Sequence, residues 1–336
     1  MKQRALKHWK LFGAAALMAG VLAGCAGEKN NATNSAKTDL PTVAFLQITT
    51  NTTLDDTRKG YLRGLTGNGF KEGENFNFEH KSAEGDIATA QLMAREFAGQ
   101  KVEVLGATSS PALQSVIKAT QDVPIVFCGV ADPASAGAIK NGQQLPNVTG
   151  ISNPDRVDKA LALVKELMPE IKTVGTLYDP SEPFTPLFRE RSQKAAKELG
   201  LQWIEISVNN TNDITTAVQA LKARGVQAIM QIPSNVADAG IAAQVKAAGA
   251  ANIPVFSTHP THIPAGALAC LGWDYEQAGY DAGVYAAEVL KGKKPAELPI
   301  KSVAKEDLVI NLPVANKFGV KIPKDVLDRA SRVEKQ

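Results

Sequence analysis

The 336-residue chain lacks the short motifs that mark the commonest enzyme sites. It has no Gly-x-Ser-x-Gly elbow, no phosphate-binding loop and no dinucleotide fingerprint after a strand. The glycines of 64–69 end a helical pattern, so they do not form such a fingerprint. After the N-terminal leader only His80, His259 and His262 remain, and their placement assembles no nucleophile–base pair. We expect a protein that is not an enzyme and has no cofactor, with an extracytoplasmic hydrolase as the least favoured alternative.

Histidine and cysteine are also too sparse to suggest a metal site. The run His259-Pro260-Thr261-His262 offers two nitrogen ligands, but a proline separates them and no cysteine or acid stands nearby. A loop is therefore favoured over a metal site. Cys128 and Cys270 lie in apolar strand patterns, which is typical of small buried side chains rather than of a disulfide.

Outside the leader, the chain has no excess of positive charge. Residues 1–24 hold four of the 37 lysines and arginines and none of the 34 acids, so the rest of the chain has one more acid than bases. No basic patch is left to favour nucleic acid as a partner.

The N-terminus carries an apolar run that is too short to span a bilayer. Ten residues with four bases precede the run Leu11 to Ala23, which has the length of a signal-peptide core. It ends at Leu22-Ala23-Gly24-Cys25, where small residues precede the cysteine as a lipoprotein signal peptidase requires. We predict a leader over 1–24, lipidation at Cys25 and a flexible tether over 25–41. The alternative is an ordinary secretory signal with an incidental cysteine.

The two halves of the chain repeat one pattern. Thr42, Asp86 and Pro124 have counterparts 131, 127 and 130 residues later. This near-constant offset predicts two similar domains rather than a solenoid of short repeats. Between them lies 146–154, whose proline, asparagine and glycine suit a bend and whose Asn153-Pro154 predicts the start of a helix.

Strand and helix patterns alternate in both halves, which implies doubly wound parallel sheets. Expected strands lie at 42–48, 76–80, 102–107, 123–130, 173–178, 201–208, 226–232, 253–258, 268–273 and 308–311. The later helices are expected at 154–168, 185–199, 213–224, 236–249 and 275–290, with one more after Pro323. The fold class is thus α/β, with two doubly wound lobes and at least two further passages of chain between them.

Candidate binding residues follow from this layout. Ligands of open parallel sheets bind outside the carboxyl ends of the strands, where helix N-termini also point free N–H groups. The residues there are mostly hydroxyls, amides and aromatics, with a few acids. The candidates are Gln47, Thr50, Thr108, Ser109, Ser110, Asp132, Tyr178, Glu182, Phe184, Ser234, Asn235, Trp273 and Asp274.

Three groups of candidates suggest particular roles. Thr108-Ser109-Ser110 precedes a proline at a helix start and suits a carboxylate, with Ser234-Asn235 as its equivalent in the second half. Asp274 suits an ammonium group, and Trp273 could stack on a ring or a cation. A simpler alternative for each hydroxyl or acid is that it caps the N-terminus of a helix. The alternative for the loop of Glu182 and Phe184 is a surface loop without a role in binding.

Several segments together resemble one family, the substrate-binding lipoproteins of ABC importers, in the group whose better-known members bind tryptophan or tyrosine. The resemblance covers 42–336. It is carried by Gly69-Phe70-Lys71-Glu72-Gly73-Glu74-Asn75, Ala107-Thr108-Ser109-Ser110-Pro111, Val130-Ala131-Asp132-Pro133 with Ala136-Gly137, Asn147-Val148-Thr149-Gly150, Val174-Gly175-Thr176-Leu177-Tyr178 and Val309-Ile310-Asn311-Leu312. Relatives often have Ala-Ser after the Gly-Ala where this chain has Leu268-Ala269 after Gly266-Ala267, so its ligand can differ from theirs.

The resemblance implies the type I periplasmic-binding fold, with two lobes joined by a three-segment hinge. The N-terminal lobe is then expected to hold 42–150 and 272–298, and the C-terminal lobe 151–271 and 299–336. It also implies an extracytoplasmic monomer, lipid-anchored to the cell membrane on its periplasmic or outer side, that captures a small solute, with an aromatic amino acid suspected. The implied partners are an ABC permease and ATPase.

Two other classes of function fit the same fold. Transcriptional repressors share it, but they need a DNA-binding headpiece where this chain has a secretion signal. A lipid-anchored sensor that presents its ligand to a receptor, or a binding protein for another amino acid or small solute, stays open as an alternative.

Overall fold

The computed structural model of the protein describes residues 40–336 except 101, 155, 183, 304–305 and 336. The predicted leader, Cys25 and most of the predicted tether lie outside the described residues. Residues from Leu40 onward form one compact unit. Within the described part of the chain, no helix combines the length and the apolar character needed to cross a membrane.

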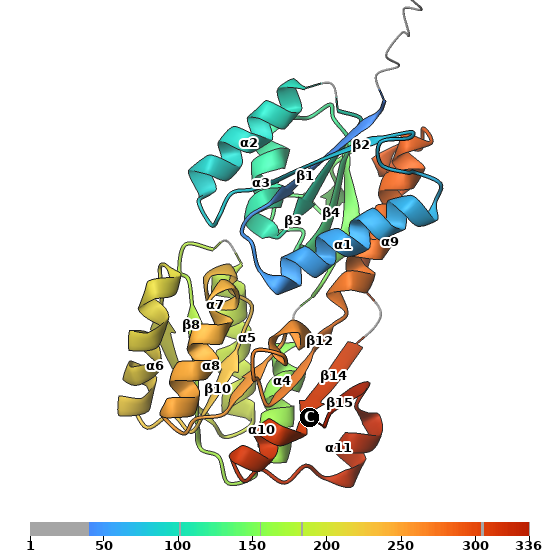
Figure 1. The fold of residues 1–336 in the computed structure, drawn as a ribbon. Helices are drawn as coiled ribbons and strands as arrows, with labels where there is room; N and C mark the ends of the chain where they lie inside the picture. Colours follow the sequence, from blue (N-terminus) through green and yellow to red (C-terminus); the bar gives the residue numbers. More distant parts are fainter. Residues whose placement is uncertain (1–39, 101, 155, 183, 304–305, 336) are drawn as a thin grey trace, which may run out of the picture. The chain divides into compact units, whose positions relative to one another are not determined.

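The first sheet has six strands, all parallel. Their order is β13-β7-β4-β3-β1-β2, and Figure 1 labels β1 to β4 among them. The bounds are β1 Thr42–Gln47, β2 Asn77–Ser82, β3 Val104–Thr108, β4 Ile125–Val130, β7 Val148–Ser152 and β13 Lys301–Ser302. We call this sheet, with the helices that cover it, the first lobe.

Helices cover both faces of the first sheet. Its strands carry hydrophobic side chains on both faces, because successive residues of a strand point to opposite sides. Ala44 and Leu46 belong to the core under α2 and α3, whereas Val43 and Phe45 pack toward α1 and α9. The bounds are α1 Thr52–Gly67, α2 Ile87–Gly99, α3 Ser110–Ala119 and α9 Tyr275–Leu290. A short hairpin of β5 Ile139–Lys140 and β6 Gln143–Gln144 leads to β7.

The second sheet has seven strands in the order β15-β14-β12-β11-β10-β8-β9. The bounds are β8 Thr173–Tyr178, β9 Gln202–Ser207, β10 Ala228–Gln231, β11 Val255–Ser257, β12 Ala269–Trp273, β14 Glu306–Asn311 and β15 Arg332–Glu334. The predicted α/β class with two doubly wound sheets is confirmed. One pair departs from the parallel expectation, because β14 runs antiparallel to β12.

The helices of this second lobe also lie on two faces. One core packs under α4 Val157–Leu167 and α5 Thr185–Glu198, and the other under α6 Ile214–Ala223 and α8 Ile241–Ala250. α7 Asn235–Ala239 precedes α8, and α10 Leu312–Lys317 and α11 Lys324–Arg329 follow the last long strand. Two expectations were wrong. The helix expected from 154 begins at Val157, and the single helix expected at 236–249 is two helices that meet at Gly240.

The chain passes between the two sheets three times. Sheet membership places these passages after Ser152, after Trp273 and between Ser302 and Glu306. Each lies two to four residues beyond the boundary expected from the sequence, at 150, 271 and 298. The strand β13 therefore belongs to the first sheet, although 299–336 was assigned to the C-terminal lobe.

The return of the chain to the first lobe depends on glycines. Gly60 and Gly64 of α1 face Gly279 and Gly283 of α9 at a distance that leaves no room for a Cβ atom. A Cβ on Gly279 would stand 1.9 Å from the carbonyl oxygen of Thr57. The two backbones are therefore in direct contact, and this contact fixes the start of α9 beside the start of α1 (Figure 1).

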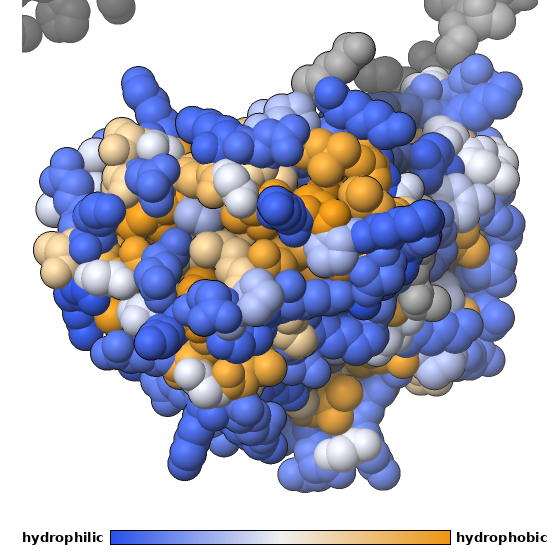
Figure 2. Space-filling model, turned by 90° about the horizontal axis from the view of Figure 1, so that it is seen from below, coloured by the Kyte–Doolittle hydropathy of each residue, from blue (hydrophilic) through white to orange (hydrophobic). Residues whose placement is uncertain are grey.

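The outer surface offers little continuous apolar area. Only Ile87 and Leu92 are large hydrophobic residues with exposed side chains among those described. In the face shown by Figure 2, hydrophobic residues form separate patches divided by hydrophilic ones. A binding site for a small solute is therefore expected in a concave region of the molecule.

Candidate functional site

A small cavity lies where the strand ends of both lobes meet. Its volume is about 40 Å³. The walls are built by segments that follow β1, β3, β4, β7 and β12 on one side and β8, β10 and β11 on the other. It is lined by Asn51, Thr53, Leu54, Ser109, Ser110, Gly129, Ala131, Asn153, Phe184, Phe188, Pro233, Ser234, Asn235, Asp238, His259 and Tyr275. We call it the inter-lobe cavity.

Ser109 and Ser110 form the first-lobe wall at the start of α3. Ser109 has a φ of 80° and a ψ of 156°, a conformation that favours glycine. Its hydroxyl does not cap the helix, and Pro111 follows at the second helical position. Both serine hydroxyls are buried and have no hydrogen-bond partner among the described residues. The expected N-cap role therefore does not explain either hydroxyl.

The second-lobe wall is built by α7 and the residues before α5. Ser234 caps α7 by accepting from the N–H of Ala237 at 3.5 Å. The N–H of Asn235 donates to Oε1 of Glu182 at 2.6 Å. Phe184 and Phe188 stack edge to face, with ring centroids 5.2 Å apart, and give this wall its apolar part.

Hydrogen bonds join residues from opposite walls. The hydroxyls of Thr53 in α1 and Thr261 are hydrogen-bonded to each other. Nε2 of His259 and the hydroxyl of Tyr275, the first residue of α9, are 2.7 Å apart. These bonds hold the two walls together at the cavity in this conformation.

Unpaired polar atoms gather around the inter-lobe cavity. Among the residues that line it, buried atoms without a hydrogen-bond partner in the described structure are Ser109 Oγ, Ser110 Oγ, Asn153 Oδ1 and Nδ2, Asn235 Nδ2, Asp238 Oδ1 and His259 Nδ1. A buried polar group without a partner destabilises a protein by about 1–3 kcal/mol. So many in one place make this cavity a candidate site for a polar ligand.

Burial also shifts the charge states of nearby groups. It raises the pKa of Glu182 well above its usual range, and the negative charges of Asp179 and Asp238 raise it further. It lowers the pKa of His262 to about 3, so this imidazole is neutral at physiological pH.

A second cavity of about 360 Å³ adjoins the first and shares Asn235 with it. Its walls include Thr49 and Glu84 from the first lobe and Asp179 and Glu182 from the second. The concave region between the lobes therefore extends beyond the inter-lobe cavity.

The structure brings five of the thirteen predicted binding residues to the inter-lobe cavity. These are Ser109, Ser110, Phe184, Ser234 and Asn235. Glu182 does not line the inter-lobe cavity. It accepts a hydrogen bond from the N–H of Asn235 and lines the second cavity.

The other predicted residues have different surroundings. Gln47 donates to the carbonyl oxygen of Thr49, Thr50 is exposed, and Thr108 is buried beside Gly129. Asp132 accepts from the N–H of Ala134, and Tyr178 packs under the guanidinium of Arg189. These five residues lie outside the lining of the inter-lobe cavity.

The last two candidates, Trp273 and Asp274, have contacts within the protein. The indole N–H of Trp273 donates to the carbonyl oxygen of Pro154, and Arg156 stacks on its ring at 4.5 Å, so the indole does not face the cavity. Asp274 is the N-cap of α9 and accepts from the N–H of Gln277 at 2.9 Å. The capping alternative is therefore realised for Asp274.

Sequence reasoning missed several cavity residues. Asn51, Thr53 and Tyr275 each stand at or near a helix start, one or a few residues beyond the positions that were chosen. Asn153 was interpreted as a helix cap. His259 directly follows the strand expected at 253–258, and its closeness to Asp238 is visible only in three dimensions.

Two doubly wound lobes, three passages of chain and a polar cavity between strand ends define a two-lobed solute-binding protein. Residues 42–334 match the family described as ABC transporter substrate binding protein, and the chain belongs to this family. Proteins of this kind work outside the cytoplasm and are not enzymes.

Known relatives agree with this assignment. The chain is 31% identical over 305 residues to the tyrosine-binding protein of Clostridioides difficile, covering 89% of this chain and 88% of the relative. A Streptococcus pneumoniae ABC domain in complex with L-Trp has 28% identity and a TM-score of 0.83, covering 88% of this chain and 99% of its own. A ligand-free, open substrate-binding protein from Clostridium difficile has 29% identity and a TM-score of 0.65, covering 88% and 100%.

Proposed function

We propose that this protein is the lipid-anchored substrate-binding protein of an ABC importer and that it captures an aromatic amino acid in the inter-lobe cavity. The observation that carries the proposal is the set of unpaired polar atoms around this cavity. A solute with both charged and apolar parts would satisfy them and would contact the phenylalanines of the second-lobe wall.

The cavity offers complementary chemistry to each part of such a ligand. The carboxylate binds the hydroxyls of Ser109 and Ser110 and the free N–H groups at the start of α3. The ring packs on Phe184 and Phe188. Oδ1 of Asn153 accepts from the ammonium group. The relatives described as binding tyrosine and L-Trp support an aromatic ligand.

Ligand entry requires the lobes to part. The cavity of about 40 Å³ is smaller than the roughly 150 Å³ that accommodates benzene in an engineered protein. At nearly equal sequence identity, the structure is more similar to the L-Trp complex than to the ligand-free open protein, which supports two conformations. The ligand favours the closed form by its differential affinity, and the closed form then docks on the permease.

Thermal unfolding in the presence of candidate solutes tests the ligand. At a concentration one hundred times Kd, the ligand adds about 2.7 kcal/mol to the free energy of unfolding. For a chain of this size, that raises Tm by roughly 2–4 °C per kcal/mol. We expect tryptophan, tyrosine or phenylalanine to raise Tm, and leucine and ribose to leave it unchanged. If only a branched amino acid or a sugar raises Tm, the aromatic ligand is rejected and the binding role is retained.

The predicted anchor is tested separately at Cys25. A Cys25→Ser variant lacks the thiol that receives the lipid, so we expect it to stay unprocessed or to leave the membrane fraction after cleavage by another peptidase. Fractionation and immunoblotting measure both outcomes. A variant that is processed and membrane-bound like the wild type would contradict lipidation at this residue.

A further inference from the structure

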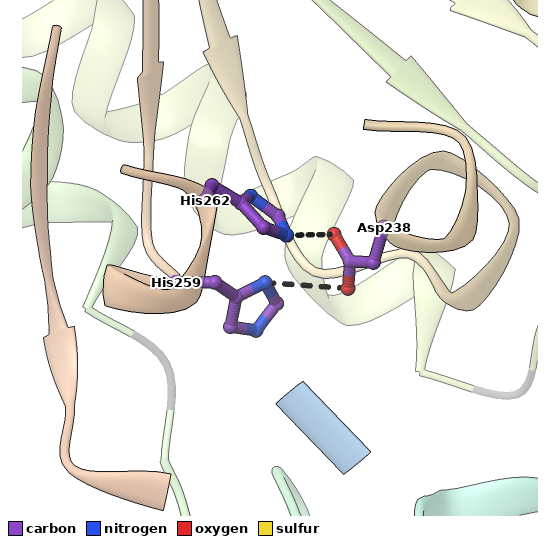
Figure 3. A group of neighbouring side chains, drawn as sticks. All are labelled: Asp238, His259 and His262. Atoms are coloured by element: carbon purple, nitrogen blue, oxygen red, sulfur yellow. Dashed lines mark ion pairs between the residues drawn. The ribbon is translucent and has the colours of Figure 1, made fainter. Parts of the chain in front are cut away.

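Asp238, His259 and His262 form a buried cluster at the second-lobe wall of the inter-lobe cavity. Nδ1 of His259 is 3.2 Å from Oδ2 of Asp238, and Nε2 of His262 is 3.5 Å from Oδ1. The three side chains are only 3–7% exposed. Figure 3 shows both imidazole rings directed at the one carboxylate. The sequence had suggested that no acid lies near the histidine pair, and this was wrong.

The spacing of the cluster suits a metal ion. One ligand atom from each residue can be chosen so that all three lie within 4.8 Å of one another. A tetrahedral ion with bonds of about 2.0–2.1 Å separates its ligand atoms by roughly 3.3 Å. Each imidazole stands at about this distance from one of the two carboxylate oxygens: Nδ1 of His259 is 3.2 Å from Oδ2, and Nε2 of His262 is 3.5 Å from Oδ1.

The atoms that face the centre of the cluster make no well-formed hydrogen bond, whereas the nitrogen on the far side of each imidazole does. Nδ1 of His259 and Oδ1 of Asp238 have no partner with hydrogen-bond geometry among the described residues. Nε2 of His259 is 2.7 Å from the hydroxyl of Tyr275, and Nδ1 of His262 is 2.7 Å from Oγ of Ser257. Outer hydrogen bonds of this kind fix the ring orientation of metal-binding histidines.

The charge of the cluster is also unbalanced. Within the described part of the chain, no lysine or arginine forms an ion pair with Asp238, and its ionic contacts are the two imidazoles. A buried carboxylate without a cation destabilises a protein by several kcal/mol. A dication at the centre of the cluster would supply the missing positive charge.

We propose that Asp238, His259 and His262 bind one divalent transition-metal ion of the zinc type. Two imidazoles and a carboxylate are ligands that Zn²⁺ and its neighbours in the first row accept. Three protein ligands leave a tetrahedral ion one position. Asp238 and His259 line the inter-lobe cavity, so this position faces it and is open to water or to a group of a bound solute.

The experiment titrates chelator-treated, untagged full-length protein with Co²⁺ and then displaces the Co²⁺ with Zn²⁺. We expect one equivalent of Co²⁺ to give the visible absorption of a tetrahedral site, and Zn²⁺ to abolish it. Asp238→Asn and His262→Gln should each weaken binding by more than the 10–100-fold that loss of an outer partner causes. The matched control is His80→Gln on β2, away from the cluster, which should bind as the wild type does.

Stability measurements separate metal loss from misfolding. Without metal, Asp238→Asn removes a buried charge, so we expect its Tm to be at least that of the wild type. Absence of a one-to-one Co²⁺ complex in the wild type, or equal binding by Asp238→Asn, would overturn the proposal.

The metal site and the proposed function fail independently. Binding of aromatic amino acids is measured in chelator-treated protein, with no metal present. A retained thermal shift there, together with no Co²⁺ binding, rejects only the metal site. Co²⁺ binding without any shift by an aromatic amino acid rejects only the proposed ligand.

Discussion

Replacing Gly279 with alanine is expected to lower Tm by about 6 °C or more. The added Cβ would stand 1.9 Å from the carbonyl oxygen of Thr57 and 3.0 Å from the backbone nitrogen of Tyr61. Both atoms belong to the backbone of α1, so the two helices have to separate. Overpacking of this kind typically destabilises by about 1–3 kcal/mol, occasionally more, and we expect the upper end here. The corresponding fall in Tm is roughly 2–4 °C per kcal/mol.

The same variant should lose affinity for the solute. The first turn of α1 contains Thr53 and Leu54, and α9 begins with Tyr275. Both helices therefore carry cavity residues in their first turns. Separating the helices would move Thr53 and Leu54 away from Tyr275. Isothermal calorimetry on the folded fraction measures this loss.

Gly67→Ala is the matched control for Gly279→Ala. Gly67 is the last residue of α1, the helix that packs against Gly279, but the nearest atom to its added Cβ is the side-chain hydroxyl oxygen of Tyr280 at 3.5 Å, an ordinary contact. Alanine in a helix is favoured over glycine by about 0.5–1 kcal/mol, so Tm should stay constant or rise. Equal Tm values for the two variants would contradict direct backbone contact between the helices.

Much of the fold could be predicted because its signals are local. A strand buried on both faces must be apolar throughout, so runs such as 42–48 and 253–258 are visible in the sequence. The repeat offset then predicts two lobes. The hairpin of β5 and β6 was missed, although Asn141-Gly142 is the typical two-residue turn and both residues have positive φ.

Other features of the fold have no local signal. Between β12 and its antiparallel partner β14 the chain passes through α9 and β13 of the first lobe, so the direction of β14 depends on where the returning chain enters the second sheet. The glycine at the break between α7 and α8 packs closely against α6, since a Cβ at position 240 would be 2.0 Å from the Cδ1 atom of Ile214. Neither spacing nor composition contains that contact.

The candidate site was predictable only in part. The rule of strand ends leads to Ser109 and Asn235, because it depends on topology alone. It cannot say which of several consecutive side chains faces inward, and Trp273 and Asp274 were chosen where Tyr275 lines the cavity. Asp238 and His259 are 21 residues apart in the sequence, so their contact requires the tertiary structure.

We expect Ser109 to lower the stability of the ligand-free protein and to strengthen binding of the solute. Its φ of 80° with a ψ of 156° is a region that glycine occupies readily and serine does not. Strain of this kind costs about 1–3 kcal/mol. We therefore expect Ser109→Gly to raise the free energy of unfolding of the ligand-free protein by about 1 kcal/mol, after allowing for the greater chain entropy of glycine.

The same substitution should weaken binding of the solute. The hydroxyl of Ser109 is buried at the cavity and unpaired, and a hydrogen bond to a charged group contributes about 1.5–3 kcal/mol. Its loss corresponds to roughly a 10–100-fold higher Kd, at 1.4 kcal/mol for each factor of ten. Ser109→Ala separates the two effects, because it removes the hydroxyl and keeps the strained backbone. Both variants lose the buried unpaired hydroxyl, so the difference in stability between them reports the backbone strain, and we expect Ser109→Gly to be the more stable of the two. Calorimetry should find both variants equally weak in binding, whereas unchanged affinity in both would show that the carboxylate binds elsewhere.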